Sequence, residues 1–467
     1  MKKIYLLFAT IFTGSVLFAQ QWNTIEIAKG VMTESYDITI GAGRNDSINR
    51  LYVSSKAGGV YEWTYNKTTK SWSDVLISNV DNKLETIALG QARNDDTTRL
   101  YFTEFGGNGR VHEATWRGNS WNIVIIDNNI GALCTFVGKG RNTATNYLYV
   151  GGGSKGLHEY FWDGTTWIKK QMHFGGLEGV GGVGDGRNDG VNRVYSNGNV
   201  LREFDWNGSN YTWTDFETTT NAPDASFIAD GRNDGVNRVY INAEAGGAPN
   251  KGRLEYTYSN GTWVVNQVHT TANRGDFMAA KLKSDGKTRL YGTQSGSCCS
   301  TVGPMREFEW DGTSWTNNII LNANSGATAL LAAGDGRNDD TTRMYATNYA
   351  SGSIWELTWP DPFVKTPLPI GVSEQQKVVN IDDDIKIEFY PIPSEDKRIT
   401  INFKNIFTEE LGVKVIDLSG RLVKEQQFNA IAPGTKKQLD LTQLTKGIYL
   451  VTIENKGFTN TQKIELR

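Results

Sequence analysis

Short segments of alternating apolar and polar residues, separated by turns rich in Gly, Asn and Asp, follow one another along most of the chain. One Tyr within these segments recurs seven times at spacings of 45 to 54 residues, as Tyr52, Tyr101, Tyr149, Tyr195, Tyr240, Tyr291 and Tyr345. A period of this length, built from strand-like segments, is typical of a β-propeller whose blades have four strands each. The pattern predicts an all-β fold with a seven-bladed β-propeller, and a solenoid is the structural alternative.

Two further markers repeat with the same period. A Glu followed after two residues by an aromatic residue, as in Glu62 to Tyr65, occurs in all seven units, and a lone Trp opens the last segment of the first six. The seventh unit has no such Trp, but Trp22 near the N-terminus begins a segment of the same form. We therefore predict that residues 22–27 form the outer strand of the last blade and close the ring, which leaves no open sheet edge.

The two ends of the chain differ from the repeats. Lys2 and Lys3 precede an apolar stretch, Ile4 to Phe18, and the small residue Ala19 follows. This order predicts a signal peptide at residues 1–19; a membrane anchor is the alternative, but the stretch is shorter than the roughly 20 residues a spanning helix needs. We expect no transmembrane segment in the mature chain. The proposed divisions are a propeller at 20–359, a proline-rich linker at 360–384 and a small β domain at 385–467.

Four motifs in the last 80 residues occur in a fixed order. They are Tyr390-Pro391-Ile392-Pro393, Val415-Ile416-Asp417-Leu418-Ser419-Gly420-Arg421, Leu444-Thr445-Lys446-Gly447-Ile448-Tyr449 and Lys463-Ile464-Glu465-Leu466-Arg467. This tail resembles the C-terminal sorting domain of proteins exported by the type IX secretion system of Bacteroidetes, although Ile392 stands where that family usually has Asn. The resemblance implies a small β-sandwich, recognition of residues 385–467 by the secretion machinery, passage through the periplasm, and release or attachment at the outer cell surface.

A repeated phrase, Asp-Gly-Arg-Asn-Asp in its fullest form, precedes most of the recurring Tyr residues. Its frame is similar to the calcium loops of integrin-type propellers, where acidic or amide oxygens surround the ion. Arg232 and Arg238, however, stand where ligand oxygens are needed. We interpret the phrase as structural and expect no metal and no cofactor, with calcium as the alternative. The predicted ion pairs are Arg44 with Asp46, Arg93 with Asp95, Arg187 with Asp189, Arg232 with Asp234, and Arg337 with Asp339, with the repeated Glu as a further partner.

Function is expected where the repeats differ. Unit six lacks the phrase and has a long loop with adjacent cysteines, which either form a strained disulfide platform or remain thiols. That loop, the long loop of unit five and the connections between blades reach the face opposite the phrases. The candidate ligand-binding residues on this face are His173, Phe174, Glu178, Glu244, His269, Arg274, Asp276, Cys298 and Cys299.

The net charge and the absence of certain motifs exclude several classes of function. With 48 basic and 51 acidic residues, the net charge of -3 provides no field that favours nucleic acid or an anionic membrane. Zinc-binding spacings and phosphate loops are absent from the sequence. We expect a secreted or cell-surface recognition module that binds polysaccharide or glycoprotein glycans. The alternatives are a structural or adhesive surface protein and a polysaccharide lyase in which His173 or His269 is the base and Arg274 neutralises a uronate.

Overall fold

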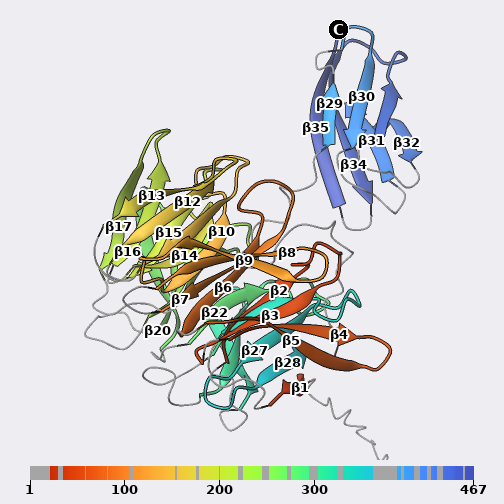
Figure 1. The fold of residues 1–467 in the computed structure, drawn as a ribbon. Helices are drawn as coiled ribbons and strands as arrows, with labels where there is room; N and C mark the ends of the chain where they lie inside the picture. Colours follow the sequence, from red (N-terminus) through yellow and green to blue (C-terminus); the bar gives the residue numbers. More distant parts are fainter. Residues whose placement is uncertain are drawn as a thin grey trace, which may run out of the picture.

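A computed structural model gives an all-β fold (Figure 1). It describes residues 21–29, 35–57, 59–80, 83–105, 109–152, 155–174, 178–198, 200–218, 225–243, 252–270, 275–293, 303–322, 330–360, 387–390, 394–403, 411–417, 422–428, 435–455 and 458–467. Within these ranges, no helix has the length and apolar character needed to cross a membrane. The predicted signal peptide and almost all of the predicted linker lie outside the described residues.

Seven four-stranded antiparallel sheets precede the C-terminal tail, and we number them one to seven in chain order. Sheets one to three contain β2 (Ser35–Gly41), β3 (Arg50–Ser55), β4 (Gly59–Asn66), β5 (Ser71–Asn79); β6 (Leu84–Gly90), β7 (Arg99–Glu104), β8 (Val111–Trp116), β9 (Trp121–Asp127); and β10 (Cys134–Gly138), β11 (Tyr147–Gly151), β12 (Leu157–Trp162), β13 (Trp167–His173). Sheets four to six contain β14 (Glu178–Gly184), β15 (Arg193–Gly198), β16 (Val200–Trp206), β17 (Tyr211–Thr218); β18 (Ala225–Ala229), β19 (Arg238–Ala243), β20 (Gly252–Ser259), β21 (Thr262–His269); and β22 (Phe277–Ala280), β23 (Arg289–Gly292), β24 (Met305–Trp310), β25 (Trp315–Leu321). Sheet seven contains β26 (Leu331–Gly334), β27 (Arg343–Thr347) and β28 (Ile354–Thr358), together with β1 (Asn23–Ala28) from the N-terminus.

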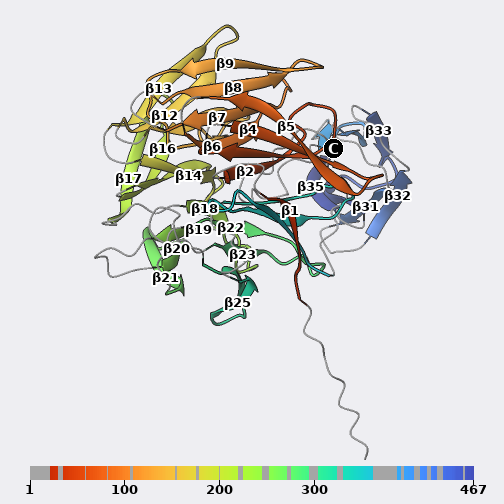
Figure 2. The ribbon, with the colours of Figure 1, turned by 60° about the horizontal axis from the view of Figure 1, so that its bottom comes forward.

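The N-terminal strand completes the last sheet, as predicted from Trp22. β1 pairs antiparallel with β28, and the Trp22 ring lies 6.0 Å from that of Tyr291 in sheet six. The first strands of successive sheets contact one another in the order β2, β6, β10, β14, β18, β22 and β26, and β26 contacts β2. Figure 2 shows the sheets from a second direction, with β1 beside the last strands of the repeat region. This cyclic order is consistent with a β-propeller.

The repeated aromatic residues build the cores between neighbouring sheets. All seven recurring Tyr side chains are buried. In six of the seven sheets the Tyr ring makes an edge contact with the Trp that opens the outer strand of the next sheet, for example Tyr52 with Trp121 at 6.0 Å. Such edge-to-face pairs bury large apolar rings and fix their orientation. The period seen in the sequence is therefore the period of sheet-to-sheet packing.

The C-terminal tail forms two sheets around one core. The smaller sheet contains β29 (Ile387–Tyr390), β30 (Arg398–Phe403) and β33 (Thr435–Asp440), and the larger contains β32 (Leu422–Phe428), β31 (Leu411–Asp417), β34 (Gly447–Asn455) and β35 (Phe458–Leu466). Ile401 from the first sheet and Val413 and Val451 from the second belong to the same buried cluster. The tail thus has a hydrophobic core of its own.

Candidate functional site

The Arg of the repeated phrase ties its own sheet to the next one. Arg44 donates from Nε to Glu62 Oε2 at 3.0 Å, and its guanidinium carbon lies 3.9 Å from the centre of the Trp116 ring in sheet two. The arrangement recurs in all seven sheets, with Lys283 replacing Arg in sheet six. The ion pairs are Arg44 with Glu62, Arg93 with Glu113, Arg141 with Glu159, Arg187 with Glu203, Arg232 with Glu255, Lys283 with Glu307, and Arg337 with Glu356.

The predicted ion pairs within the phrase are wrong in their partners. Asp46 pairs with Arg50 at 2.7 Å and not with Arg44. In the same way Asp95, Asp189, Asp234 and Asp339 pair with Arg99, Arg193, Arg238 and Arg343, and not with Arg93, Arg187, Arg232 and Arg337. The reason is the turn geometry: Asn45 has φ 59°, so the residues on either side of it leave the turn in different directions. The repeated Glu, expected as a further partner, is the main partner of the phrase Arg.

The Asn of the phrase joins neighbouring sheets. Asn94 donates from Nδ2 to the Asn146 carbonyl at 3.0 Å, and its Oδ1 accepts the Asn146 backbone N–H at 2.7 Å. Asn45, Asn142, Asn188, Asn233 and Asn338 make corresponding contacts with the sheets that follow them. Sequence reasoning missed this role, although recurrence of Asn at one place in the turn was a signal for it.

The acidic residues that begin the phrase bind backbone groups of the same turn. Asp185 accepts the N–H groups of Asp189 and Gly190 at 3.0 and 2.7 Å, and Asp230 and Asp335 do the same. Within the described ranges, no three His, Cys, Asp or Glu side chains gather in a way that could hold a metal ion. The carboxylates at the first position of the calcium-loop frame therefore accept backbone hydrogen bonds within their own turns in this structure.

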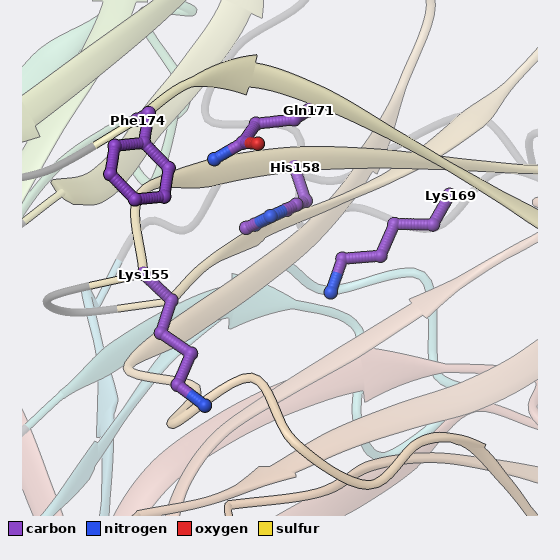
Figure 3. A pocket seen from close by; sticks show the side chains of 5 residues that line it. All are labelled: Lys155, His158, Lys169, Gln171 and Phe174. Carbon is purple, nitrogen blue, oxygen red and sulfur yellow. The ribbon is translucent and has the colours of Figure 1, made fainter.

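A hollow of about 510 Å³ lies at the opposite end of sheet three, away from the phrases. Its lining consists of Lys155, His158, Lys169, Gln171 and Phe174, which Figure 3 shows around a shared space. His158 on β12 and Gln171 on β13 are cross-strand partners, so the two strands place them side by side. Lys155 precedes β12 and Phe174 follows β13, which brings the two connections to the same end of the sheet.

Residues of sheet two hold the lysines in place. Lys169 Nζ lies 2.8 Å from Asp127 Oδ2, and Tyr160 donates its hydroxyl to the same carboxylate at 2.8 Å. Lys155 donates to the Asn129 carbonyl at 3.2 Å and also contacts the side-chain oxygen of Asn129. The hollow therefore lies beside the junction of sheets two and three, and its cations are oriented before any ligand binds.

The side chains in and beside the hollow differ in their charge at pH 7. Burial, with the nearby Lys169 charge, lowers the pKa of His158 to about 4, so this ring is neutral at pH 7. Burial opposes ionisation of Asp127, but hydrogen bonds from Lys169, the Asn129 backbone and Tyr160 outweigh it and lower the pKa of this carboxyl. Lys155 and Lys169 against Asp127 leave one net positive charge among these groups.

Phe174 is the most exposed large apolar side chain in the described part of the protein, at 79%. Its ring lies at the hollow together with Lys155, Lys169 and Gln171. Its neighbour His173 packs instead against aromatic rings, 5.1 Å from Trp213 and 6.4 Å from Phe204 in sheet four. The structure thus places Phe174 at the hollow, whereas His173 lies at the junction of sheets three and four.

Asp276 and His269, the other predicted site residues whose side chains the structure describes, do not line this hollow. Asp276 is buried, and its carboxylate accepts the backbone N–H groups of Phe277 and Leu331 at 2.8 Å each, which connects sheets six and seven. His269 belongs to sheet five, and only the backbone of Glu178 is described. Glu244, Arg274, Cys298 and Cys299 lie outside the described residues. Lys155, Lys169 and Gln171 were missed, because polar residues in a turn or on an outer strand look like any solvent-facing pattern.

Comparison with known proteins identifies the tail. Residues 388–467 match the Secretion system C-terminal sorting domain. The resemblance stated from the four tail motifs is thus confirmed, and the domain implies export, with secretion or attachment at the outer surface. A search among curated proteins finds no match.

Solved structures resemble the larger part of the chain. BBS1N in its complex with ARL6DN is 14% identical and has a TM-score of 0.50, with 73% of this chain and 98% of that chain covered. The SapL1 lectin in complex with alpha methyl fucoside is 18% identical with a TM-score of 0.39, covering 63% and 99% of the two chains. The Aleuria aurantia lectin is 15% identical with a TM-score of 0.39, covering 65% and 100%. At 14% identity the likeness to BBS1N concerns the fold and not the roles of residues.

Proposed function

We propose that the protein is an exported recognition module that binds glycans at the hollow of sheet three. The observation that carries the proposal is the exposed Phe174 ring beside Lys155, Lys169 and Gln171. A sugar ring has an apolar face and a rim of hydroxyl groups, so it needs an apolar surface next to oriented donors and acceptors. These residues provide both kinds of contact.

The organisation expected from the sequence completes this proposal. The seven sheets are seven blades of one propeller, and the two sheets of the tail form a β-sandwich. Residues 1–19 are a signal peptide, residues 20–359 the propeller, residues 360–384 a linker, and residues 385–467 the sorting domain that the secretion machinery handles. Export supports glycan binding, because polysaccharides and glycoproteins are abundant outside the cell.

Preorganisation strengthens the proposed site. Asp127 and Asn129 already hold the two lysine amines, so a ligand does not have to order these long side chains when it binds. The one net positive charge of the hollow favours glycans that carry a carboxylate or sulfate over their neutral counterparts. Because the lysines are solvent-accessible, this preference should weaken as salt concentration rises.

A glycan array with the mature chain tests the proposal, using Phe174→Ala and the matched control Val264→Ala. Val264 is also an exposed apolar residue, 54% accessible, but it lies on β21 in sheet five. We expect the wild type and V264A to bind the same glycans, and F174A to bind them about fivefold more weakly, since one aromatic contact contributes about 1 kcal/mol. Absence of binding across the array, or unchanged binding by F174A, would contradict the proposal.

A further inference from the structure

An arginine occupies a core position of sheet five. The residue two places before the repeated Glu is Arg253 in this sheet, and it is 1% exposed. In the other six sheets the same position holds a buried apolar residue: Val60, Val111, Leu157, Leu201, Met305 and Ile354. A charged group therefore stands where the fold otherwise uses an aliphatic side chain.

The neighbouring sheet makes room for this arginine. Gly292 ends β23 in sheet six, and a Cβ atom at this position would lie 2.3 Å from Arg253 Nε and 2.6 Å from its Cζ. The corresponding positions of the other sheets all carry side chains: Val53, Phe102, Val150, Ser196, Ile241 and Ala346. The two departures from the repeat are complementary, since the missing side chain of Gly292 creates the space that the guanidinium fills.

No carboxylate of the described residues pairs with Arg253. Its Nη2 donates to the Thr293 carbonyl, and its buried Nε–H has no partner within the same described set. The guanidinium lies 5.3 Å and 5.2 Å from the centres of the Phe277 and Phe308 rings. Burial and the charge of Arg306, opposed by Asp276, lower the pKa of Arg253 to about 9. A buried cation that has no carboxylate partner among the described residues is destabilising, so its presence requires an explanation.

Two other basic side chains lie near this arginine. His269 is the cross-strand partner of Arg253, and its ring lies 5.5 Å from that of Phe308. Arg306 on β24 donates to Asn317 at 2.7 Å, whereas the equivalent Arg202 of sheet four pairs with the Asp215 carboxylate at 2.8 Å. The partner of Arg306 on the adjacent strand is thus a neutral amide, whereas that of Arg202 is a carboxylate. Burial, Arg253 and Arg306 together lower the pKa of His269.

We propose that Arg253, His269 and Arg306 form an anion-binding site that accepts the carboxylate of a small ligand between sheets five and six. The planar guanidinium presents paired N–H donors that match the two oxygens of a carboxylate. Phe308 supplies an apolar wall that contacts both Arg253 and His269. The site is separate from the hollow of sheet three and does not depend on the proposed glycan binding.

Thermal unfolding of the full chain in different sodium salts tests this site. The salts are chloride, acetate and glucuronate at equal ionic strength, and the proteins are the wild type, Arg253→Leu, Gly292→Ala and Lys169→Met. Leucine at position 253 matches Leu157 and Leu201, so this variant should fold. We expect a carboxylate salt to raise the wild-type midpoint by about 2 °C or more relative to chloride. R253L should show no such rise and should unfold at a higher temperature than the wild type in chloride, because it removes the unpaired charge.

The remaining variants and salts separate the explanations. G292A keeps the charge but displaces the guanidinium, and we expect it to lose the response to carboxylate. K169M alters only the hollow of sheet three, which is itself proposed to favour acidic glycans, so this variant should keep the response to acetate. An equal response to acetate and glucuronate identifies a free carboxylate as sufficient, and a response to glucuronate alone identifies an acidic sugar. No carboxylate-specific rise in the wild type, or the same rise in R253L, would overturn the site and leave Arg253 as a residue that only stacks between two phenyl rings.

Discussion

The pair formed by Arg187 and Glu203 in sheet four tests the role of the repeated phrase. Arg187 donates from Nε to Glu203 Oε2 at 3.0 Å, and its guanidinium carbon lies 4.6 Å from the centre of the Tyr258 ring in sheet five. The Glu203 side chain is fully buried, and that of Arg187 is 20% exposed. Arg187→Met keeps most of the side-chain length but removes the nearest cation from the buried carboxylate, which keeps the Tyr195 hydroxyl at 3.0 Å and Arg193 Nε at 3.8 Å.

The expected loss follows from these contacts. Removal of one partner of a buried ion pair costs about 3 to 5 kcal/mol, and the partial exposure of Arg187 places the loss near 3. The lost contact with the Tyr258 ring adds about 0.5 to 1 kcal/mol. We therefore expect R187M to lower the free energy of unfolding by about 3 to 4 kcal/mol, measured by urea denaturation with tryptophan fluorescence.

The chain contains its own control for this change. In sheet six Lys283 replaces Arg, with its Nζ 2.7 Å from Glu307 and 3.8 Å from the centre of the Trp359 ring. Arg187→Lys should therefore lose less, about 1 to 2 kcal/mol, because it keeps the charge and gives up one of two hydrogen bonds. An equal loss in R187K and R187M would refute the charge pairing, and no loss in either would refute the structural role of the phrase.

The pH dependence of R187M has a definite sign. Burial raises the pKa of Glu203, and the hydrogen bond and charge of Arg187 oppose that rise. Without Arg187 the pKa should rise further. A carboxyl with a raised folded-state pKa contributes stability below its unfolded pKa of about 4.3, and this contribution is lost as the pH rises through the folded-state value. The deficit of R187M relative to the wild type should therefore be smallest near about pH 4 and grow toward about pH 8.

Two further substitutions test the links between sheets. Asn94→Ala should lower the free energy of unfolding by about 2 to 3 kcal/mol, because it removes two contacts to Asn146 and strains a left-handed residue with φ 55°. Asn94→Gly removes only the contacts and should lose about 1 to 2 kcal/mol in the same urea assay; a larger loss in N94G than in N94A would contradict this account. Trp22→Ala should cost about 2 kcal/mol, since the half-buried ring packs against Tyr291 and Trp359, whereas Ile25→Ala at a 48% exposed position of the same strand should cost much less. Equal thermal midpoints for W22A and the wild type would argue against a closing role for the N-terminal strand.

The sequence predicts the fold well because the fold is repeated. Each Tyr, Glu and outer-strand Trp occupies an equivalent place, so a pattern too weak in one unit becomes clear over seven. Even the displaced strand at Trp22 was predictable, because its missing copy could be counted. The number of repeats can be counted from the residues that pack between sheets, because these are the residues that recur.

The ion-pair and hydrogen-bond partners of charged residues such as Arg44 and Asp276 were harder to predict. Arg44 and Asp46 are close in sequence, which favoured a local pair, but Glu62 on another strand is the partner of Arg44. Asp276, expected at a ligand site, bridges two backbones, and nothing in its immediate sequence distinguishes these roles. Side-chain direction in a tight turn depends on backbone conformation, which the pattern of residue types does not specify.

The candidate site could be predicted only in part. Phe174 was identified because it lies in a connection between blades that was expected to reach the candidate face, whereas Lys155, Lys169 and Gln171 lie in ordinary polar surroundings. The register of β12 and β13 and the contacts with Asp127 and Asn129 bring them together. Arg253 was also missed, since one arginine among many attracts notice only when its position in the repeat is aligned with six aliphatic residues.

The most direct test of the central claim is a structure of the protein with the glycan that the array identifies. Recognition at the hollow of sheet three predicts a sugar ring stacked on Phe174, with hydroxyl or carboxylate groups in contact with Lys155, Lys169 or Gln171. A glycan bound instead at the end that carries the repeated phrases, with the hollow of sheet three empty, would contradict it.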